Sequence, residues 1–200
     1  MGCQNAKSSQ KEDCEDEKEL GDFLTVEEIE VIRHTWAIVK QDIPGTGMFM
    51  FTRLFELQSD FKKFFKRMMT QTETGEYDFD RNKLGNHANV VMTALDKAVD
   101  SLDDSSFLSK GLAELGERHK MYNVKSEMIP YMWPAVRDAL KKALAEDFTV
   151  EAELAWKHVF DYIVSKMAQG INSGSGSPTK TSTPKNISPL HDSGANGIPP

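Results

Sequence analysis

Two histidines, His87 and His119, are the side chains of this sequence with the clearest capacity for chemistry. They stand 32 residues apart, and each falls on the apolar stripe of a segment with helical periodicity. The aromatic residues Phe61, Phe64 and Phe65 precede both of them. Because histidine offers iron a neutral nitrogen at physiological pH, two histidines that point into an apolar interior predict a pocket for haem.

The helical stripes that carry these histidines are regular. The first consists of Leu84, His87, Val91, Leu95, Ala98 and Leu102, and the second of Leu108, Leu112, Leu115 and His119. Residues three and four apart lie on one side of a helix, so both rings are expected to face the core. A single histidine on an apolar face is more often a satisfied core residue than a ligand, and only the combination with Phe65 favours haem.

Capping and breaking residues predict the limits of the neighbouring helices. Thr25 followed by Glu28 is a capping-box pair, so a first helix is predicted over 26–40. The Pro-Gly pair at 44–45 breaks that helix, and a second helix then ends near Leu57. No sustained alternation of apolar and polar residues is present, so the fold class is predicted to be all-α, with about six to eight helices.

Capping residues and prolines also predict the limits of the elements after residue 70. The polar stretch 70–80 predicts a loop, and Ser126 is expected to cap the helix after His119. Pro134 predicts a kink or a delayed helix start. Thr149 is expected to cap the last helix and Gly170 to end it.

Composition divides the chain into three parts. With 39% hydrophobic and 28% charged residues, the 200-residue chain predicts one folded domain with polar additions. We predict an acidic N-terminal segment over 1–24, the folded domain over 25–170, and a disordered tail rich in serine, proline and glycine over 171–200.

Charge and cysteine usage exclude several classes of function. A net charge of −7 and a pI near 5.3 argue against nucleic acid as a partner. Cys3 and Cys14 both precede the helical pattern, so no disulfide framework is predicted and the protein is expected to be intracellular. No stretch is apolar enough for a signal peptide or a membrane span, so any membrane contact is expected to come from lipid.

The first residues suggest such a lipid. Removal of Met1 would expose Gly2 for myristoylation beside Cys3, a candidate for palmitoylation, although Ala6 replaces the usual serine or threonine. A single myristoyl chain holds a protein only marginally, and the acidic segment that follows cannot attract anionic lipid, so the second signal would have to be an acyl group on Cys3. The predicted location is the cytoplasmic face of a membrane if the chain is acylated, and otherwise the cytoplasm.

The segment from about Thr25 to Gln169 resembles the globin family, in particular neuroglobin-like and globin X-like intracellular globins. The matching positions agree in order and spacing: Trp36, Phe51 in Met-Phe-Thr-Arg-Leu-Phe, Phe65, His87 in Leu-Gly-Asn-His-Ala-Asn-Val-Val, Val91, His119 in Leu-Gly-Glu-Arg-His, Val124-Lys125 and Trp156. The globin X-like part of the resemblance comes from the Gly-Cys start and the long tails.

The resemblance implies a set of site residues for haem b. His119 would be the proximal iron ligand and His87 the distal one. An apolar wall of the pocket would be formed by Phe51, Phe65, Val91 and Val124. The second ring nitrogen of His119 needs a hydrogen-bond partner, which the sequence does not identify.

The resemblance also implies a function, with alternatives. Iron held by both histidines would bind O2, CO or NO after His87 dissociates, which favours a redox, protective or signalling role at a membrane, with a reductase or signalling partner still to be identified. A five-coordinate globin for oxygen storage or transport, in which His87 only steadies the ligand, is the first alternative, and a haem-free interaction module is the second. The common enzyme motifs are missing, so any catalysis would belong to the haem.

Overall fold

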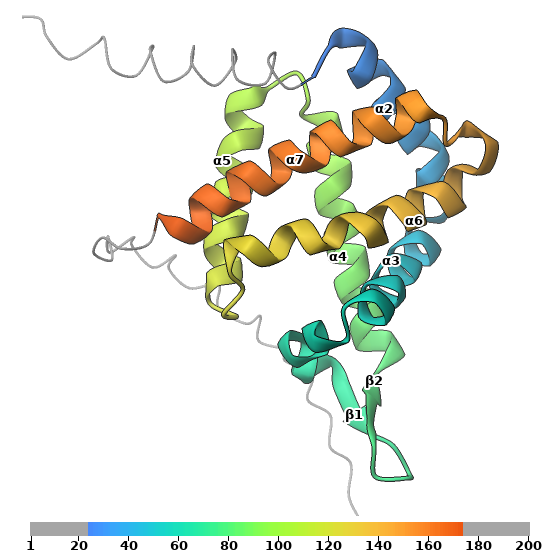
Figure 1. Ribbon diagram of the computed structural model, residues 1–200, viewed down its shortest axis with the longest axis vertical. Helices are drawn as coiled ribbons and strands as arrows, with labels where there is room; N and C mark the ends of the chain where they lie inside the picture. The colour runs from blue at the N-terminus through green and yellow to red at the C-terminus, as the bar shows by residue number, and fades with distance from the viewer. Residues whose placement is uncertain (1–23, 174–200) are drawn as a thin grey trace, which may run out of the picture.

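The computed structural model describes residues 24–173, and this part of the chain is mostly helical (Figure 1). The predicted acylation sites Gly2 and Cys3 lie outside the described residues, as do residues 174–200 of the predicted tail. The division at residues 24 and 170 therefore stays a prediction.

The described residues contain six α-helices, as the all-α prediction expected. These are α2 (Val26–Val39), α3 (Ile43–Leu57), α4 (Arg81–Asp100), α5 (Ser105–Lys120), α6 (Trp133–Leu144) and α7 (Val150–Asn172). Four 3-10 helices join them: η1 (Lys40–Asp42), η2 (Ser59–Met68), η3 (Ser126–Met132) and η4 (Ala145–Asp147). The strands β1 (Met69–Gln71) and β2 (Tyr77–Phe79) form the one hairpin of the described residues.

Most of the predicted helix limits are confirmed. Thr25 accepts the N–H of Glu28 at 3.2 Å, and the Glu28 carboxylate accepts the Thr25 N–H at 2.8 Å, which completes the capping box. Thr149 caps α7 through the N–H of Ala152. Pro134 lies in the first turn of α6, where its missing N–H removes no helical hydrogen bond, so the delayed start is confirmed.

The predicted cap at Ser126 is wrong. Residue 126 begins η3, a 3-10 helix that has no side-chain cap. The Ser126 hydroxyl donates instead to the side-chain oxygen of Asn172 at 3.3 Å, which ties η3 to the end of α7. The serine therefore joins two elements that are far apart in the sequence.

The predicted loop over 70–80 contains the hairpin. Met69 pairs with Phe79 and Gln71 with Tyr77 in antiparallel register. Gly75, with a φ of +85°, permits the tight turn between the strands. Strands of three residues are too short to show an alternating pattern, which is why the sequence did not predict them.

Helices α5 and α7 pack with their backbones in direct contact, and Figure 1 shows them crossing. A Cβ atom at Gly116 would overlap the backbone carbonyl of Met167, and a Cβ atom at Gly170 would overlap that of Ala113. The prediction that Gly170 ends the last helix is therefore wrong, since α7 continues to Asn172. This glycine permits close packing and does not terminate the helix.

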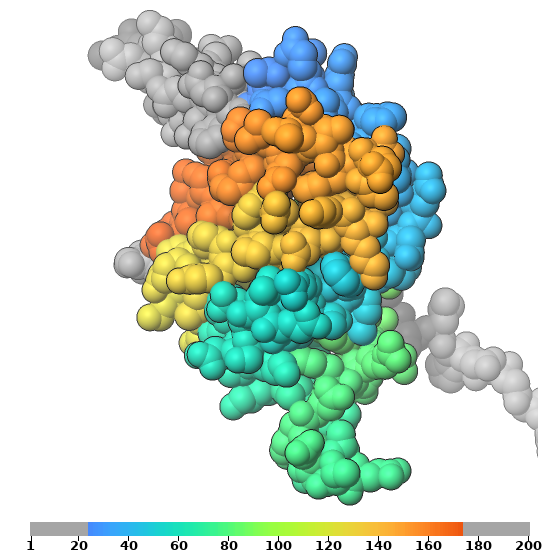
Figure 2. Space-filling model, turned by 45° about the vertical axis from the view of Figure 1, so that its right-hand side comes forward, coloured from blue at the N-terminus to red at the C-terminus, as the bar shows by residue number. Residues whose placement is uncertain are grey.

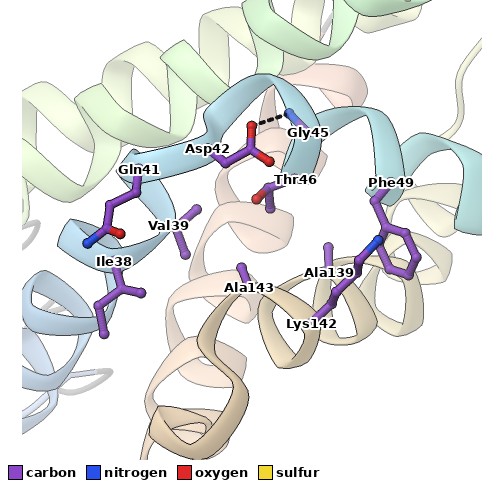
Figure 3. A pocket seen from close by; sticks show the side chains of 10 residues that line it. All are labelled: Ile38, Val39, Gln41, Asp42, Gly45, Thr46, Phe49, Ala139, Lys142 and Ala143. Carbon is purple, nitrogen blue, oxygen red and sulfur yellow. Dashed lines mark hydrogen bonds between the residues drawn. The ribbon is translucent and has the colours of Figure 1, made fainter.

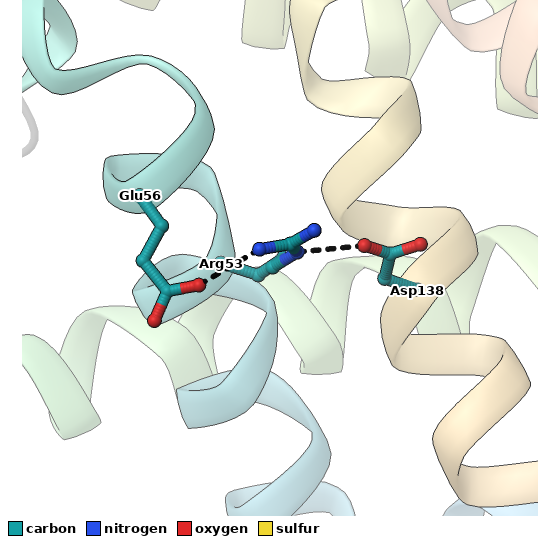
Figure 4. Close-up of polar contacts among 3 residues, drawn as sticks. All are labelled: Arg53, Glu56 and Asp138. Atoms are coloured by element: carbon teal, nitrogen blue, oxygen red, sulfur yellow. Dashed lines mark hydrogen bonds and ion pairs between the residues drawn. The ribbon is translucent and has the colours of Figure 1, made fainter.

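Polar contacts connect the other helices. The Trp156 indole N–H donates to the buried hydroxyl of Thr35 at 2.9 Å, which links α7 to α2. Arg53 of α3 donates to the carboxylate of Asp138 of α6 at 2.7 Å and to Glu56 at 3.0 Å (Figure 4). The contacts of Trp156 with Thr35 and of Arg53 with Asp138 each join two helices that form the walls of the domain.

None of the helices within residues 24–173 combines the length and the apolar character that crossing a bilayer requires.

The glycine contact predicts opposite effects for two substitutions on the same helix. Gly116→Ala should lower the free energy of unfolding by about 1–3 kcal/mol, because the added methyl group forces α5 away from α7. Gly111→Ala places its methyl in open space and should raise the free energy of unfolding by up to about 1 kcal/mol through helix propensity. Urea unfolding followed by far-ultraviolet circular dichroism measures both, and equal effects would contradict the packing argument.

Candidate functional site

His119 lies in the last turn of α5, and its ring is held by the helix itself. Its Nδ1 lies 2.8 Å from the carbonyl oxygen of Leu115, one turn earlier. A carbonyl can only accept a hydrogen bond, so this contact places the proton of the neutral ring on Nδ1. Nε2 then keeps its lone pair free for a metal ion. The carbonyl of Leu115 is the partner that the sequence left unidentified.

The backbone after His119 closes the end of α5. The N–H of Val124 donates to the carbonyl of His119 at 3.3 Å, and Asn123 has a positive φ of 59°. The left-handed conformation of an asparagine turns the chain back, so that Val124 follows close behind the histidine.

His87 lies on α4 with its ring against two aromatic side chains. The ring centroid is 5.1 Å from that of Phe51 and 5.5 Å from that of Phe65, both in edge-on geometry. Phe51 is 2% exposed, whereas His87 and Phe65 are partly buried. The structure thus brings together Phe51, Phe65 and His87, which were predicted to line one site.

The electrostatics of His87 favour the form that binds metal. Burial lowers the pKa of His87 below its usual value, and the nearby His119 lowers that pKa further because two positive rings would repel each other. The imidazole of His87 is therefore neutral at pH 7, as a metal ligand must be. The effect of His119 on the pKa of His87 also indicates that the two rings lie near each other.

The remaining predicted wall residues are Val91, one turn after His87 on α4, and Val124, which follows α5. Both are partly buried and pack against the core. Leu95 and Leu115, on the same stripes as the histidines, are partly buried as well. These apolar side chains face inward and yet stay partly exposed. They therefore leave apolar surface that a ligand between α4 and α5 could cover.

Two aromatic residues beyond the predicted wall residues extend the cluster. The ring centroid of Phe55 lies 5.0 Å from that of Phe65, and the ring stacks on Phe79 with centroids 4.4 Å apart. Phe55 lies one turn after Phe51 on α3, so helical spacing was a usable signal for it. Phe79 belongs to β2, in the polar stretch predicted as a loop, and it had no such signal.

The arrangement fits haem. Helix α4 packs mainly on α3, whereas α5 packs mainly on α7, so the two helices that carry the histidines have separate supports. Imidazole nitrogen suits iron, and the aromatic and aliphatic side chains suit the apolar macrocycle. A flat group between α4 and α5 would cover the partly exposed side chains of both.

The two hollows that stand out in the described structure lie elsewhere. One, of about 310 Å³, lies between the start of α3 and α6 (Figure 3). Its Asp42 carboxylate accepts the Gly45 N–H at 2.9 Å, and its Lys142 ammonium lies 4.1 Å from the ring centroid of Phe49. The other, also about 310 Å³, lies beside Trp133. Neither contains a predicted haem residue, and charged groups of the first are engaged within the fold.

Comparison with known proteins agrees with this geometry. The model of the Globin family matches residues 48–167. Cytoglobin-2 of Oryzias latipes is 29% identical over 74% of this chain and 82% of its own length. Neuroglobin-1 of Oncorhynchus mykiss is 28% identical over 74% of this chain and 92% of its own length.

A solved structure shows the same fold. It is the crystal structure of a hexacoordinated haem protein from an anhydrobiotic tardigrade, with a TM-score of 0.66 at 22% identity, and the match covers 74% of this chain and 95% of that one. The matched segment includes both candidate ligands and all four predicted wall residues. This chain belongs to the globin family.

Proposed function

We propose that His119 and His87 both bind the iron of haem b, the cofactor of this haem-binding globin, and that O2, CO or NO binds after His87 leaves. The observation that carries the proposal is the pair of ring environments. His119 has its Nδ1 hydrogen-bonded and its Nε2 free, and the pKa of His87 is lowered toward the neutral form. The hexacoordinated state of the tardigrade protein, which shares the fold, supports the same arrangement.

Different residues would act on the two sides of a bound haem. The bond from His119 to Leu115 fixes the orientation of the proximal ring and increases its basicity as a ligand. Phe51 and Phe65 contact the ring of His87 edge-on, and their apolar rings would keep water from that side of a bound haem. When bound, the iron supplies reversible ligand binding and one-electron redox chemistry.

A resident distal ligand favours a redox, protective or signalling role over oxygen storage. Any external ligand must displace His87, so its apparent affinity falls by the fraction of protein in which the iron is open. The Gly2 and Cys3 acyl groups would place this chemistry at a membrane.

A second function is favoured by the contacts of the distal ring. Because Phe51 and Phe65 already support His87, the ring is also suited to stay off the iron and donate a hydrogen bond to bound dioxygen. The protein would then be a five-coordinate globin for oxygen storage or transport.

Visible absorption of the reduced, ligand-free protein separates these two functions. With both histidines on the iron, we expect the sharp split bands of low-spin ferrous haem, and in His87→Leu a single broad high-spin band with faster CO binding. A wild-type spectrum already high-spin, with CO rates unchanged by the substitution, would establish the five-coordinate alternative.

Loss of the proximal ligand tests the other half of the site. His119→Ala should lose haem on gel filtration or retain it only weakly, because no other histidine lies on α5. The exposed His34 provides the matched control, and His34→Ala should keep the full haem content. Full retention of haem by His119→Ala would remove the assignment.

The membrane part of the proposal has its own test. Cells fed myristate and palmitate analogues should label the wild-type protein with both, Cys3→Ser with myristate alone, and Gly2→Ala with neither. The labelled wild type should sediment with membranes and both variants much less. Unlabelled wild-type protein would refute the anchoring.

A further inference from the structure

A group of positive charges on η2 contrasts with the overall acidity of the protein. Lys62, Lys63, Lys66 and Arg67 are four of its ten residues, although the chain has a net charge of −7. All four side chains are exposed, and none forms an ion pair with another residue of the segment 24–173. We call these four residues the basic face of η2.

Many other exposed cations of the domain are neutralised locally. Examples are Arg33 with Asp103 at 2.6 Å and Lys40 with Asp96 at 2.6 Å. A cation paired at this distance contributes little field beyond its partner, whereas several unpaired cations on one short element add their fields. The basic face is therefore a local positive surface that can attract an anionic partner.

The aromatic side chains of η2 connect it to the proposed haem site. Phe61, Phe64 and Phe65 are partly buried, and the Phe65 ring makes the edge-on contact with His87 at 5.5 Å. The backbone leaves helical geometry at Phe65, with φ −108° and ψ 17°, in the middle of the basic face. A molecule that docks on the cations thus contacts the same short helix that carries Phe65, whose ring contacts the proposed iron ligand.

The surroundings of the basic face favour a folded protein over a membrane. Figure 2 shows the teal surface that includes η2 on the outside of the molecule, with the green hairpin below it. The hairpin is acidic, since it carries exposed Glu73, Glu76 and Asp78. A uniformly anionic bilayer would repel the hairpin, whereas a protein can match the cations with acidic groups within a screening length of about 8 Å.

We propose that the basic face of η2 docks an acidic electron-transfer protein that reduces the haem of this globin. One electron leaves the reduced flavin or haem of the donor and converts ferric iron to ferrous iron, and no atom or group is transferred. The inference rests on the proposed function, because the electron needs haem between His87 and His119. The docking itself depends on the cations alone.

The test uses the full-length protein and an acidic flavodoxin as the probe. In the η2 triple variant, Lys62→Gln, Lys63→Gln and Lys66→Gln, we expect the association rate with reduced flavodoxin at low ionic strength to fall roughly tenfold. Stopped-flow absorption of the haem under argon measures the reduction rate. Titration calorimetry with oxidised flavodoxin measures affinity, with and without haem.

A control variant carries the same change in net charge. Lys97, Lys110 and Lys141 are exposed on α4, α5 and α6, and the triple substitution of these residues by glutamine should leave rate and affinity near the wild-type values. Equal losses in the two triple variants would overturn the docking surface, since only net charge would then matter. So would an η2 triple variant that keeps flavodoxin binding and loses binding to phosphatidylserine vesicles, which would identify a membrane surface.

Failure of the proposed function has a separate signature. A protein that takes up no haem shows no visible absorption, and calorimetry on that haem-free chain still decides whether the basic face binds flavodoxin. Haem that is bound and reduced at equal rates in the wild type and both triple variants contradicts the docking inference alone.

Discussion

The backbone contact between α5 and α7 is the constraint on which the haem site depends. Gly116 faces the backbone of Met167, and Gly170 faces that of Ala113. A side chain at either glycine would separate the two helices. His119 lies three residues after Gly116, within one helical turn. The packing of α5 against α7 therefore also sets the position of the His119 ring. The carbonyl of Leu115 then fixes its rotation. The proposed iron ligand is therefore positioned by helix packing, and a change of volume remote from its ring would move it.

The distal side has a different support. At Gly47, α3 comes close to Ala88 and Met92 of α4, and Ala88 follows His87 directly in the sequence. The rings of Phe51 and Phe65 then hold His87 from the side. Because α4 packs mainly on α3 and α5 on α7, the proposed distal ligand could leave the iron without loss of the α5–α7 contact. Separate supports make a reversible sixth ligand compatible with a firmly held fifth ligand.

Sequence patterns predicted those features that depend on local spacing. The stripes through His87 and His119, the capping box at Thr25 and the delayed start at Pro134 all follow from helical periodicity or backbone chemistry. Features that depend on contacts between distant segments were missed or misread. Glycine is typical of helix ends, but Gly170 instead permits the close contact of α7 with the backbone of α5. Phe79 joins the aromatic cluster although it lies in a polar stretch of the sequence.

The balance between His87 and an external ligand follows from these supports. Burial keeps the distal imidazole neutral, so near neutral pH the balance depends on position and not on a proton. If His87 occupied the iron for about 99% of the time, the apparent affinity for a gas would fall roughly 100-fold, which corresponds to about 2.7 kcal/mol. A shift of α4 against α3 would directly change the fraction of time for which His87 occupies the iron. Under the proposed ligation, the contact around Gly47 and Ala88 would therefore tune the choice between redox protein and oxygen store, while the packing of α5 on α7 would keep His119 in place.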